Sequence, residues 1–344
     1  MRVLHVCPTY FSPDSVVAGG ERYSLGLAKT MARVTPTTLV TFGESEFERR
    51  DGDLTIHCYR RWTNVKGAFG NPLNPMFLKE VWASDVVHCH QFMTVASDIA
   101  ILGGAAAGKK VFVTDLSGSS TFSLSHRLPL WRAVRAFLLI SDFNRSLFQR
   151  FPLKKAVVLG GVDAAEFRPT GGERSKRILF VGRLMPHKGV HLLIDALDAD
   201  MELDVVGQAP DAAYLASLKE KAKGRRVRFL EGTRDDALLG MYREAAVVAI
   251  PSRLDGGYTT ALEAMACETP VVVTAVGSLP ELVTDGETGF IVSPDDMSGL
   301  HARLRQLRDD RELAATMGRA GRASVEARFT WERVVEGCLR EYAS

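Results

Sequence analysis

The chain has 344 residues, which is enough for two α/β domains of ordinary size. Its composition, 46% hydrophobic and 24% charged, excludes a largely disordered chain, and a net charge of +2 gives no indication of nucleic-acid binding. No apolar run approaches the roughly 18 residues that a membrane-spanning helix requires.

The five cysteines are scattered, and their spacing is not that of a metal-binding motif. Most lie in or beside apolar runs, so we expect reduced, buried thiols and a cytoplasmic protein. The first residues, MRVLHVCPTY, are too short for a signal peptide and are typical of a strand. Peripheral attachment to the cytoplasmic face of a membrane is left open.

Short apolar segments predict a parallel sheet in the N-terminal half of the chain. The predicted strands are 3–7, 37–41, 54–59, 85–90 and 110–114. After the first of them, Gly19 and Gly20 open a helix with apolar residues at helical spacing: Tyr23, Leu27, Ala28 and Met31. A glycine pair at a helix N-terminus is a candidate anion site, although such turns are also common without a ligand.

The strand at 85–90 carries two histidines. His88 and His90 point to one face because side chains alternate along a strand. Only a residue at the C-terminal end of a parallel strand lines the crevice of an α/β fold. We therefore expect His90 to be a site residue and His88 to be packed and hydrogen-bonded.

The segment at 126–139 mixes basic residues with Trp131 and leucines. We expect a short core helix with a solvated basic edge. The alternative is a surface that rests on anionic lipid through Arg132 and Arg135.

A second domain is predicted after the stretch 169–176, PTGGERSK, which has the composition of a linker. A strand at 177–181 leads into a turn that places Arg183 and Lys188 beside glycines. These cations suit a diphosphate because arginine offers a planar fork and lysine a mobile point charge. The alternative is a solvated basic loop.

Another buried strand, at 246–250, leads into a glycine loop and then a helix. The candidate ligand-binding residues there are Gly256, Gly257, Tyr258, Thr259, Thr260 and Glu263. Backbone N–H groups and the helix dipole favour a phosphate at such a turn. The two carboxylates, Asp255 and Glu263, would repel phosphate, so they suit the hydroxyls of a sugar or ribose instead.

This segment resembles the donor-site signature of family 4-type retaining glycosyltransferases, which are glycosyl transferases of group 1. The matching residues are Glu263, Ala264-Met265-Ala266, Thr269-Pro270-Val271-Val272 and Asp285-Gly286. The chain departs from the family pattern at four positions: Asp255 (usually Glu), Glu268 (usually Gly), Gly160 (usually Asn) and Leu116 (usually His).

The resemblance implies the GT-B fold, an α/β architecture in which two Rossmann-like, doubly wound domains face an interdomain cleft. An acceptor-side domain at 1–168 and the linker at 169–176 would precede a nucleotide-sugar domain at 177–328. The segment 329–344 would form a terminal helix that crosses back to the N-terminal domain, with Trp331 as a structural residue.

The implied activity is transfer of a sugar, with retention at the anomeric carbon, from a nucleotide-diphosphate sugar to an acceptor hydroxyl. The resemblance implies no metal and no cofactor. Arg183 and Lys188 would stabilise the leaving diphosphate, and the acceptor would be a glycan, a lipid-linked sugar or a small molecule.

Further roles follow from the same resemblance. Glu263 would hold the ribose hydroxyls, Asp255 the sugar hydroxyls, and His90 the transferred sugar. Gly19 and Gly20 would face the diphosphate, and Gly232 would lie in a loop over the base. Two alternatives remain open: a nucleotide-sugar epimerase of the same fold, and a nucleotide-sugar-binding protein without catalysis.

Overall fold

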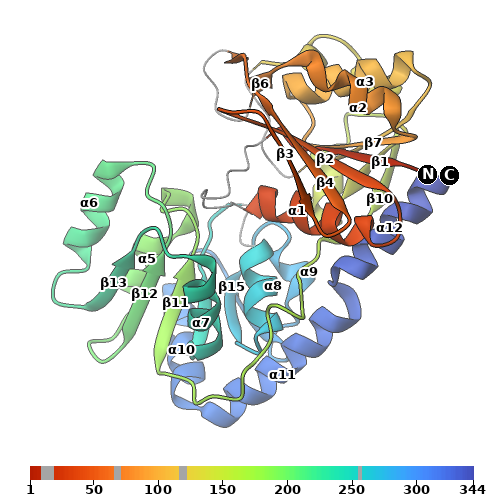
Figure 1. Ribbon diagram of the computed structural model, residues 1–344. Coiled ribbons are helices and arrows are strands. Elements are labelled where there is room, and N and C mark those ends of the chain that lie inside the picture. Colours follow the sequence, from red (N-terminus) through yellow and green to blue (C-terminus); the bar gives the residue numbers. More distant parts are fainter. Residues whose placement is uncertain (9–18, 66–70, 116–121, 255–257) are drawn as a thin grey trace. The chain divides into compact units, whose positions relative to one another are not determined.

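The computed structural model describes residues 1–8, 19–65, 71–115, 122–254 and 258–344 (Figure 1). The chain divides into two compact units, Met1–Gly161 with Trp331–Ser344, and Val162–Thr330. The predicted linker at 169–176 thus falls within the second unit. Arg174 ties it there by donating hydrogen bonds to the carbonyls of Arg243, Ala245 and Cys267 and to the Thr269 hydroxyl.

The first unit is built on a sheet with the strand order β10-β9-β8-β7-β1-β2-β4-β3 in the described residues. Its strands are β1 (Val3–Val6), β2 (Thr37–Gly43), β3 (Phe47–Asp51), β4 (Leu54–Arg60), β7 (Val86–His90), β8 (Lys110–Thr114), β9 (Ala136–Leu139) and β10 (Lys154–Val157). Neighbouring strands are parallel except β3, which pairs with β4 in the antiparallel sense. A separate two-stranded ribbon joins β5 (Thr63–Asn64) and β6 (Pro72–Leu73).

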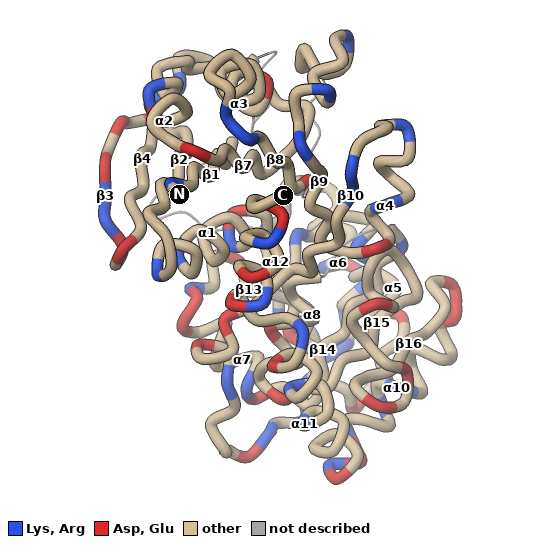
Figure 2. Tube along the Cα trace, turned by 90° about the vertical axis from the view of Figure 1, so that its right-hand side faces the viewer, with Lys and Arg blue, Asp and Glu red and all other residues tan. Residues whose placement is uncertain are grey.

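Strand β3 was not predicted from the sequence. Its residues, FERRD, lack an apolar alternation because most of their side chains face water at the edge of the sheet. Figure 2 shows the acidic and basic residues along this strand. Charged side chains on an edge strand discourage pairing with another chain.

Helices cover both faces of this sheet. They are α1 (Gly19–Ala32), α2 (Leu78–Ala83), α3 (Val95–Ala106), α4 (Phe143–Leu147) and α12 (Trp331–Ala343), with 3-10 turns η2 (Pro75–Phe77), η3 (Leu124–His126) and η4 (Leu130–Ala133). Helices α1 and α12 pack together on one face (Figure 1), and α2 and α3 pack on the other. The apolar residues of α1 that the helical spacing predicted are buried, and Ser24, Thr30 and Ala32 are buried with them.

Trp331 has the expected structural role. Its indole is 8% exposed and packs edge-on against Tyr23. It also fills the space that a side chain on Gly26 or Gly161 would need, so both positions require glycine. Helix α12 is thereby fixed against α1 within the first unit.

The prediction of one helix at 126–139 is wrong. The chain forms the short 3-10 turns η3 and η4 and then enters strand β9. Pro129 stands between the turns, and proline cannot donate the backbone hydrogen bond that a continuous helix would need.

The second unit is a parallel sheet with the order β13-β12-β11-β14-β15-β16. Its strands are β11 (Arg177–Val181), β12 (Glu202–Val206), β13 (Arg226–Leu230), β14 (Val247–Ile250), β15 (Val271–Thr274) and β16 (Gly289–Val292). Its helices are α5 (Val190–Asp195), α6 (Ala212–Lys221), α7 (Asp235–Glu244), α8 (Tyr258–Ala266), α9 (Leu279–Leu282), α10 (Met297–Asp309) and α11 (Arg311–Arg328), and η5 (Pro186–Lys188) is a 3-10 turn.

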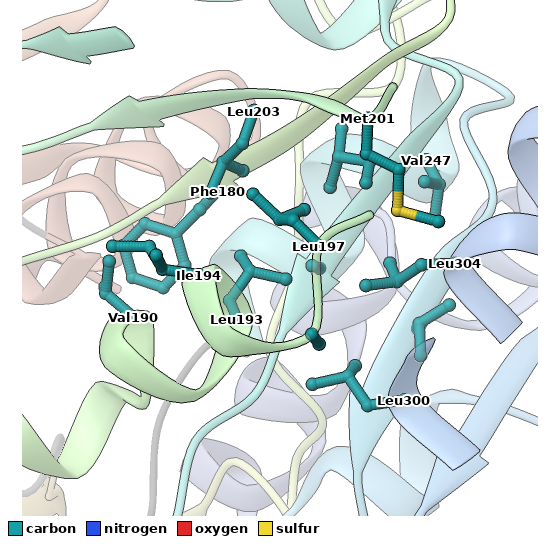
Figure 3. Packing of buried hydrophobic residues seen from close by; sticks show 14 of the residues in the cluster. Phe180, Val190, Leu193, Ile194, Leu197, Met201, Leu203, Val247, Leu300 and Leu304 are labelled. Carbon is teal, nitrogen blue, oxygen red and sulfur yellow. The ribbon is translucent and has the colours of Figure 1, made fainter. Parts of the chain in front are cut away.

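An apolar core joins one face of this sheet to α5, α6, α10 and α11. Phe180 of β11 packs with Val190 and Leu193 of α5, and Leu300 and Leu304 of α10 close the same cluster (Figure 3). The apolar spacing predicted for α10 is confirmed, since Leu300, Leu304 and Leu307 are all buried.

The five cysteines are buried thiols, as predicted. Within the described residues, none of the helices has both the length and the apolar character needed to cross a bilayer.

Candidate functional site

The second sheet has one topological switch point, between β11 and β14. From β11 the chain proceeds outward to β12 and β13, and then returns to the other side of β11 for β14, β15 and β16. Open α/β sheets bind ligands outside the C-terminal ends of the strands at such a point. The loops that follow β11 and β14 therefore frame the candidate site.

The loop after β11 carries the two predicted cations. Arg183 is exposed, and within the described residues its guanidinium has no hydrogen-bond or ion-pair partner. Lys188 is half-buried and ends the turn η5. Gly189 follows with a φ of 73°, in the left-handed region that favours glycine, and α5 begins at the next residue.

This loop is attached directly to the loop after β14. The backbone N–H of Arg253 donates a hydrogen bond to the carbonyl of His187 at 2.8 Å. The carbonyl of Pro251 lies where a β-carbon on Gly189 would stand. The structure thus brings the Lys188 turn together with the backbone that leads to Asp255. Asp255, Gly256 and Gly257 themselves lie outside the described residues.

The hydroxyl of Ser252 belongs to the same loop. It is buried and has no hydrogen-bond partner among the described residues. A buried hydroxyl is normally paired, so Ser252 is an exception among the described residues.

Helix α8 begins at Tyr258, as the glycine loop predicts, and its first turn contains Thr259 and Thr260. All three are half-buried, and the Thr260 hydroxyl donates to the carbonyl of Val181 at 3.4 Å, which ties the helix start to the end of β11. Unpaired N–H groups of a first turn form an anion site when their helix is held in place in this way.

Glu263 lies one turn into α8 and is 4% exposed. Its Oε2 accepts a hydrogen bond from the Tyr242 hydroxyl of α7 at 2.7 Å. A carboxylate this buried needs such a donor, and the bond orients it. Tyr242 was not predicted as a site residue, because a tyrosine at an apolar helical position gives no indication that its hydroxyl forms a hydrogen bond.

Gly232 follows β13, the edge strand of the sheet. It is exposed, with a φ of 66° and open space around its α-carbon. It lies at the C-terminal edge of the sheet, two strands from β11, and is thus further from the switch point than the other predicted residues.

The first sheet has its own switch point, between β1 and β7. His90 ends β7 there, and Gly20 lies in the first turn of α1, which begins at Gly19. His90 is 1% exposed and its ring meets the Tyr23 ring edge-on. His88 is fully buried and bonded to Thr114 and Tyr342, which confirms its predicted packed role.

His5, which lies on β1 in register with His88, was not predicted as a site residue. Its Nδ1 and the Nε2 of His90 are 2.8 Å apart. Burial lowers the pKa of His5 to about 3 and lowers the pKa of His88 and of His90 well below its ordinary value. The three rings are therefore neutral at pH 7 and act as hydrogen-bonding groups.

Comparisons with known proteins agree with these features. The family described as glycosyl transferases group 1 matches residues 163–324. The D-inositol 3-phosphate glycosyltransferase of Geodermatophilus obscurus is 33% identical over an alignment of 355 positions, gaps included, that covers 95% of this chain and 74% of that protein. An uncharacterized glycosyltransferase of Methanocaldococcus jannaschii is 32% identical over 165 residues. That match covers 48% of this chain and 47% of the relative, so it spans about half of each.

Among solved structures, HepE of Anabaena in complex with UDP and glucose superposes with a TM-score of 0.76 at 20% identity. The match covers 100% of this chain and 99% of that one. It confirms the predicted GT-B architecture of two Rossmann-like units. With the family match and the Geodermatophilus relative, it leads to one conclusion: the chain belongs to the group 1 glycosyl transferases.

Proposed function

We propose that this glycosyltransferase takes a nucleotide-diphosphate sugar as donor and transfers the sugar, with retention and without a metal ion, to an acceptor hydroxyl. The observation that carries the proposal is the switch point of the second sheet, where a loop with two cations is fastened to the loop that opens α8. The related fold of HepE, which was solved with UDP and glucose, supports a donor of this class.

Arg183 and Lys188 would act on the leaving diphosphate, which gains charge as the glycosidic bond breaks. Cations and N–H groups held in place for that charge lower the transition state more than the ground state. Removing one such donor typically costs about 3–4 kcal/mol of barrier. Two protein cations can thus serve where other transferases use a divalent ion, so we propose that the reaction needs neither metal nor cofactor.

The remaining roles concern hydroxyl groups. Glu263, oriented by Tyr242, would bind the ribose, and Asp255 would bind the sugar. His90 would contact the transferred sugar as a neutral group. Gly256, Gly257, Tyr258, Thr259 and Thr260 would hold phosphate at the start of α8, while Gly19 and Gly20 would do so at α1 and Gly232 would lie near the base.

The acceptor would approach the first unit, as a glycan, a lipid-linked sugar or a small molecule. For a cytoplasmic enzyme with a lipid-linked acceptor, we propose a peripheral membrane contact at 124–132. Leu124 and Leu128 are 42% and 48% exposed there, beside the exposed Arg127 and Arg132. Co-sedimentation with anionic vesicles that is lost in Leu128→Asp would support this contact, and equal sedimentation of both proteins would contradict it.

The donor site is tested with Arg183→Ala and Lys188→Ala. Each should lower turnover with UDP-glucose, or another donor found by thermal shift, by about 10²–10³-fold while the melting temperature stays within about 2 °C of wild type. Lys223→Ala removes an exposed cation of the same unit, which forms an ion pair with Glu220, and is the control. Near-normal turnover in both variants would remove the phosphate-binding role.

The same preparation tests the finer parts of the proposal. Activity that survives EDTA supports metal independence, and the anomeric configuration of the product decides between retention and inversion. Incubation without an acceptor separates a transferase, which at most hydrolyses the donor slowly, from an epimerase, which converts it. Donor binding without transfer to any acceptor would favour a binding protein instead.

A further inference from the structure

Three buried histidines lie side by side at the switch point of the first sheet. His5 belongs to β1, and His88 and His90 belong to the neighbouring β7. They are 0%, 0% and 1% exposed. All three point to the face that α1 and α12 cover, since His88 bonds to Tyr342 of α12 and His90 meets Tyr23 of α1.

The hydrogen bonds of the three rings differ. His88 has both nitrogens occupied, because Nε2 bonds to the Thr114 hydroxyl at 2.8 Å and Nδ1 to the Tyr342 hydroxyl at 2.6 Å. His5 and His90 share one hydrogen bond, between Nδ1 of His5 and Nε2 of His90. Their other nitrogens, Nε2 of His5 and Nδ1 of His90, have no partner among the described residues.

Such a cluster could bind a metal ion, since one nitrogen of each ring lies within 4.8 Å of the others. The hydrogen bonds of His88 disfavour a metal site, because they leave no nitrogen of that ring for a metal. A hydrogen bond accounts for the short distance between His5 and His90 without a metal.

The proton count then couples the two rings. A neutral imidazole carries one ring proton, and only one proton fits between Nδ1 of His5 and Nε2 of His90. If His5 donates, Nε2 of His90 carries no proton, and the ring proton of His90 is on Nδ1. If His90 donates, Nδ1 of His90 carries no proton, and the ring proton of His5 is on Nε2. The unpaired Nδ1 of His90 is thus a donor in one case and an acceptor in the other.

We propose that His5 is a positioning residue that fixes the tautomer of His90, and with it whether Nδ1 of His90 donates a hydrogen bond to a ligand hydroxyl or accepts one. The ligand is the transferred sugar, so this part rests on the proposed function. Either arrangement puts both rings in the same tautomer, Nδ1–H in both or Nε2–H in both. Different tautomers would place two protons or two lone pairs face to face.

The tautomers are read by NMR of the full-length protein, isotope-labelled at the histidine nitrogens. His5→Asn and His90→Asn assign the signals by their loss. We expect His5 and His90 to share one tautomer in the wild type, and His90 to become a mixture in His5→Leu. Discordant tautomers in the wild type, or an unchanged His90 signal in His5→Leu, would overturn the proposal.

Kinetics supply the second measurement. His5→Leu should lower kcat/KM for the donor sugar about tenfold, the effect of one lost hydrogen bond, and His5→Asn should restore most of it, because an amide can bond near the position of Nδ1. An equal loss of kcat/KM in His5→Leu and His5→Asn, at an unchanged melting temperature, would also overturn the proposal. If no donor supports transfer, the proposed function fails, while the NMR measurement still decides the role of His5. If the purified protein contained one metal ion per chain and His5→Leu did not, the three histidines would be a metal site and the shared hydrogen bond would be ruled out.

Discussion

A β-carbon on Gly189 would collide with the backbone carbonyl of Pro251. The two residues belong to the loops after β11 and β14, on either side of the switch point. Gly189 also has a φ of 73°, which glycine adopts without steric strain. Glycine at this position lets the two backbones approach closely, and the hydrogen bond from Arg253 to His187 fastens the Lys188 turn to the loop after β14.

Gly189→Ala should therefore destabilise the second unit by about 2 kcal/mol or more, since a backbone clash adds to the strain of the left-handed conformation. Gly224→Ala is the matched control, because Gly224 has a φ of 77° but open space around it. It should cost only about 1 kcal/mol. Urea unfolding measures both, and equal losses would show that the contact with Pro251 contributes nothing.

Tyr242→Phe removes the hydroxyl that bonds to Glu263. A buried carboxylate that loses a donor should lower the free energy of unfolding by about 1–3 kcal/mol. If Glu263 binds ribose, donor affinity should fall as well, because the carboxylate is no longer oriented. Tyr214→Phe, which removes a half-buried hydroxyl bonded to His191, is the control. Unchanged stability and donor affinity in Tyr242→Phe would contradict the orienting role.

Glu268 stands where the family usually has glycine, and the structure gives the reason for the usual choice. Its φ is 58°, a left-handed conformation just after the end of α8. Glu268→Gly should be about 1 kcal/mol more stable than Glu268→Ala, because both remove the carboxylate and only glycine relieves the backbone. Calorimetry of the two variants measures this difference. An alanine variant as stable as the glycine variant would rule out strain at this position.

The fold was largely predictable because the strands and helices of both units carry apolar residues at regular spacing. The failures have local causes. Strand β3 is charged and is held by its pairing with β4, which no local pattern reports. The segment at 126–139 is apolar enough for a helix, yet Pro129 divides it.

The site was predictable only where a motif carries it. Arg183, Lys188 and Glu263 follow strands in a recognisable pattern, and the structure places their loops at the switch point, while their roles stay predictions. Tyr242 and His5 have no such pattern. Each forms a hydrogen bond with a residue far away in the sequence, 21 positions for Tyr242 and Glu263 and 85 for His5 and His90, so only the fold brings the partners together.

The buried histidines predict how stability depends on pH. Burial lowers the pKa of His5 from 6.5 in the unfolded chain to about 3, so the unfolded state binds more protons between these values. The contribution of neutral His5 to stability is therefore complete above pH 6.5 and is lost as the pH drops toward 3, by up to about 1.4 kcal/mol per pH unit. His88 and His90 act in the same direction. In urea unfolding from pH 7 to pH 4, the free energy of unfolding of His5→Asn should thus fall less steeply than that of the wild type. His126→Asn, at an exposed site, is the control. A wild-type slope in His5→Asn would mean that the folded protein protonates His5 as readily as the unfolded chain does, and would contradict the lowered pKa.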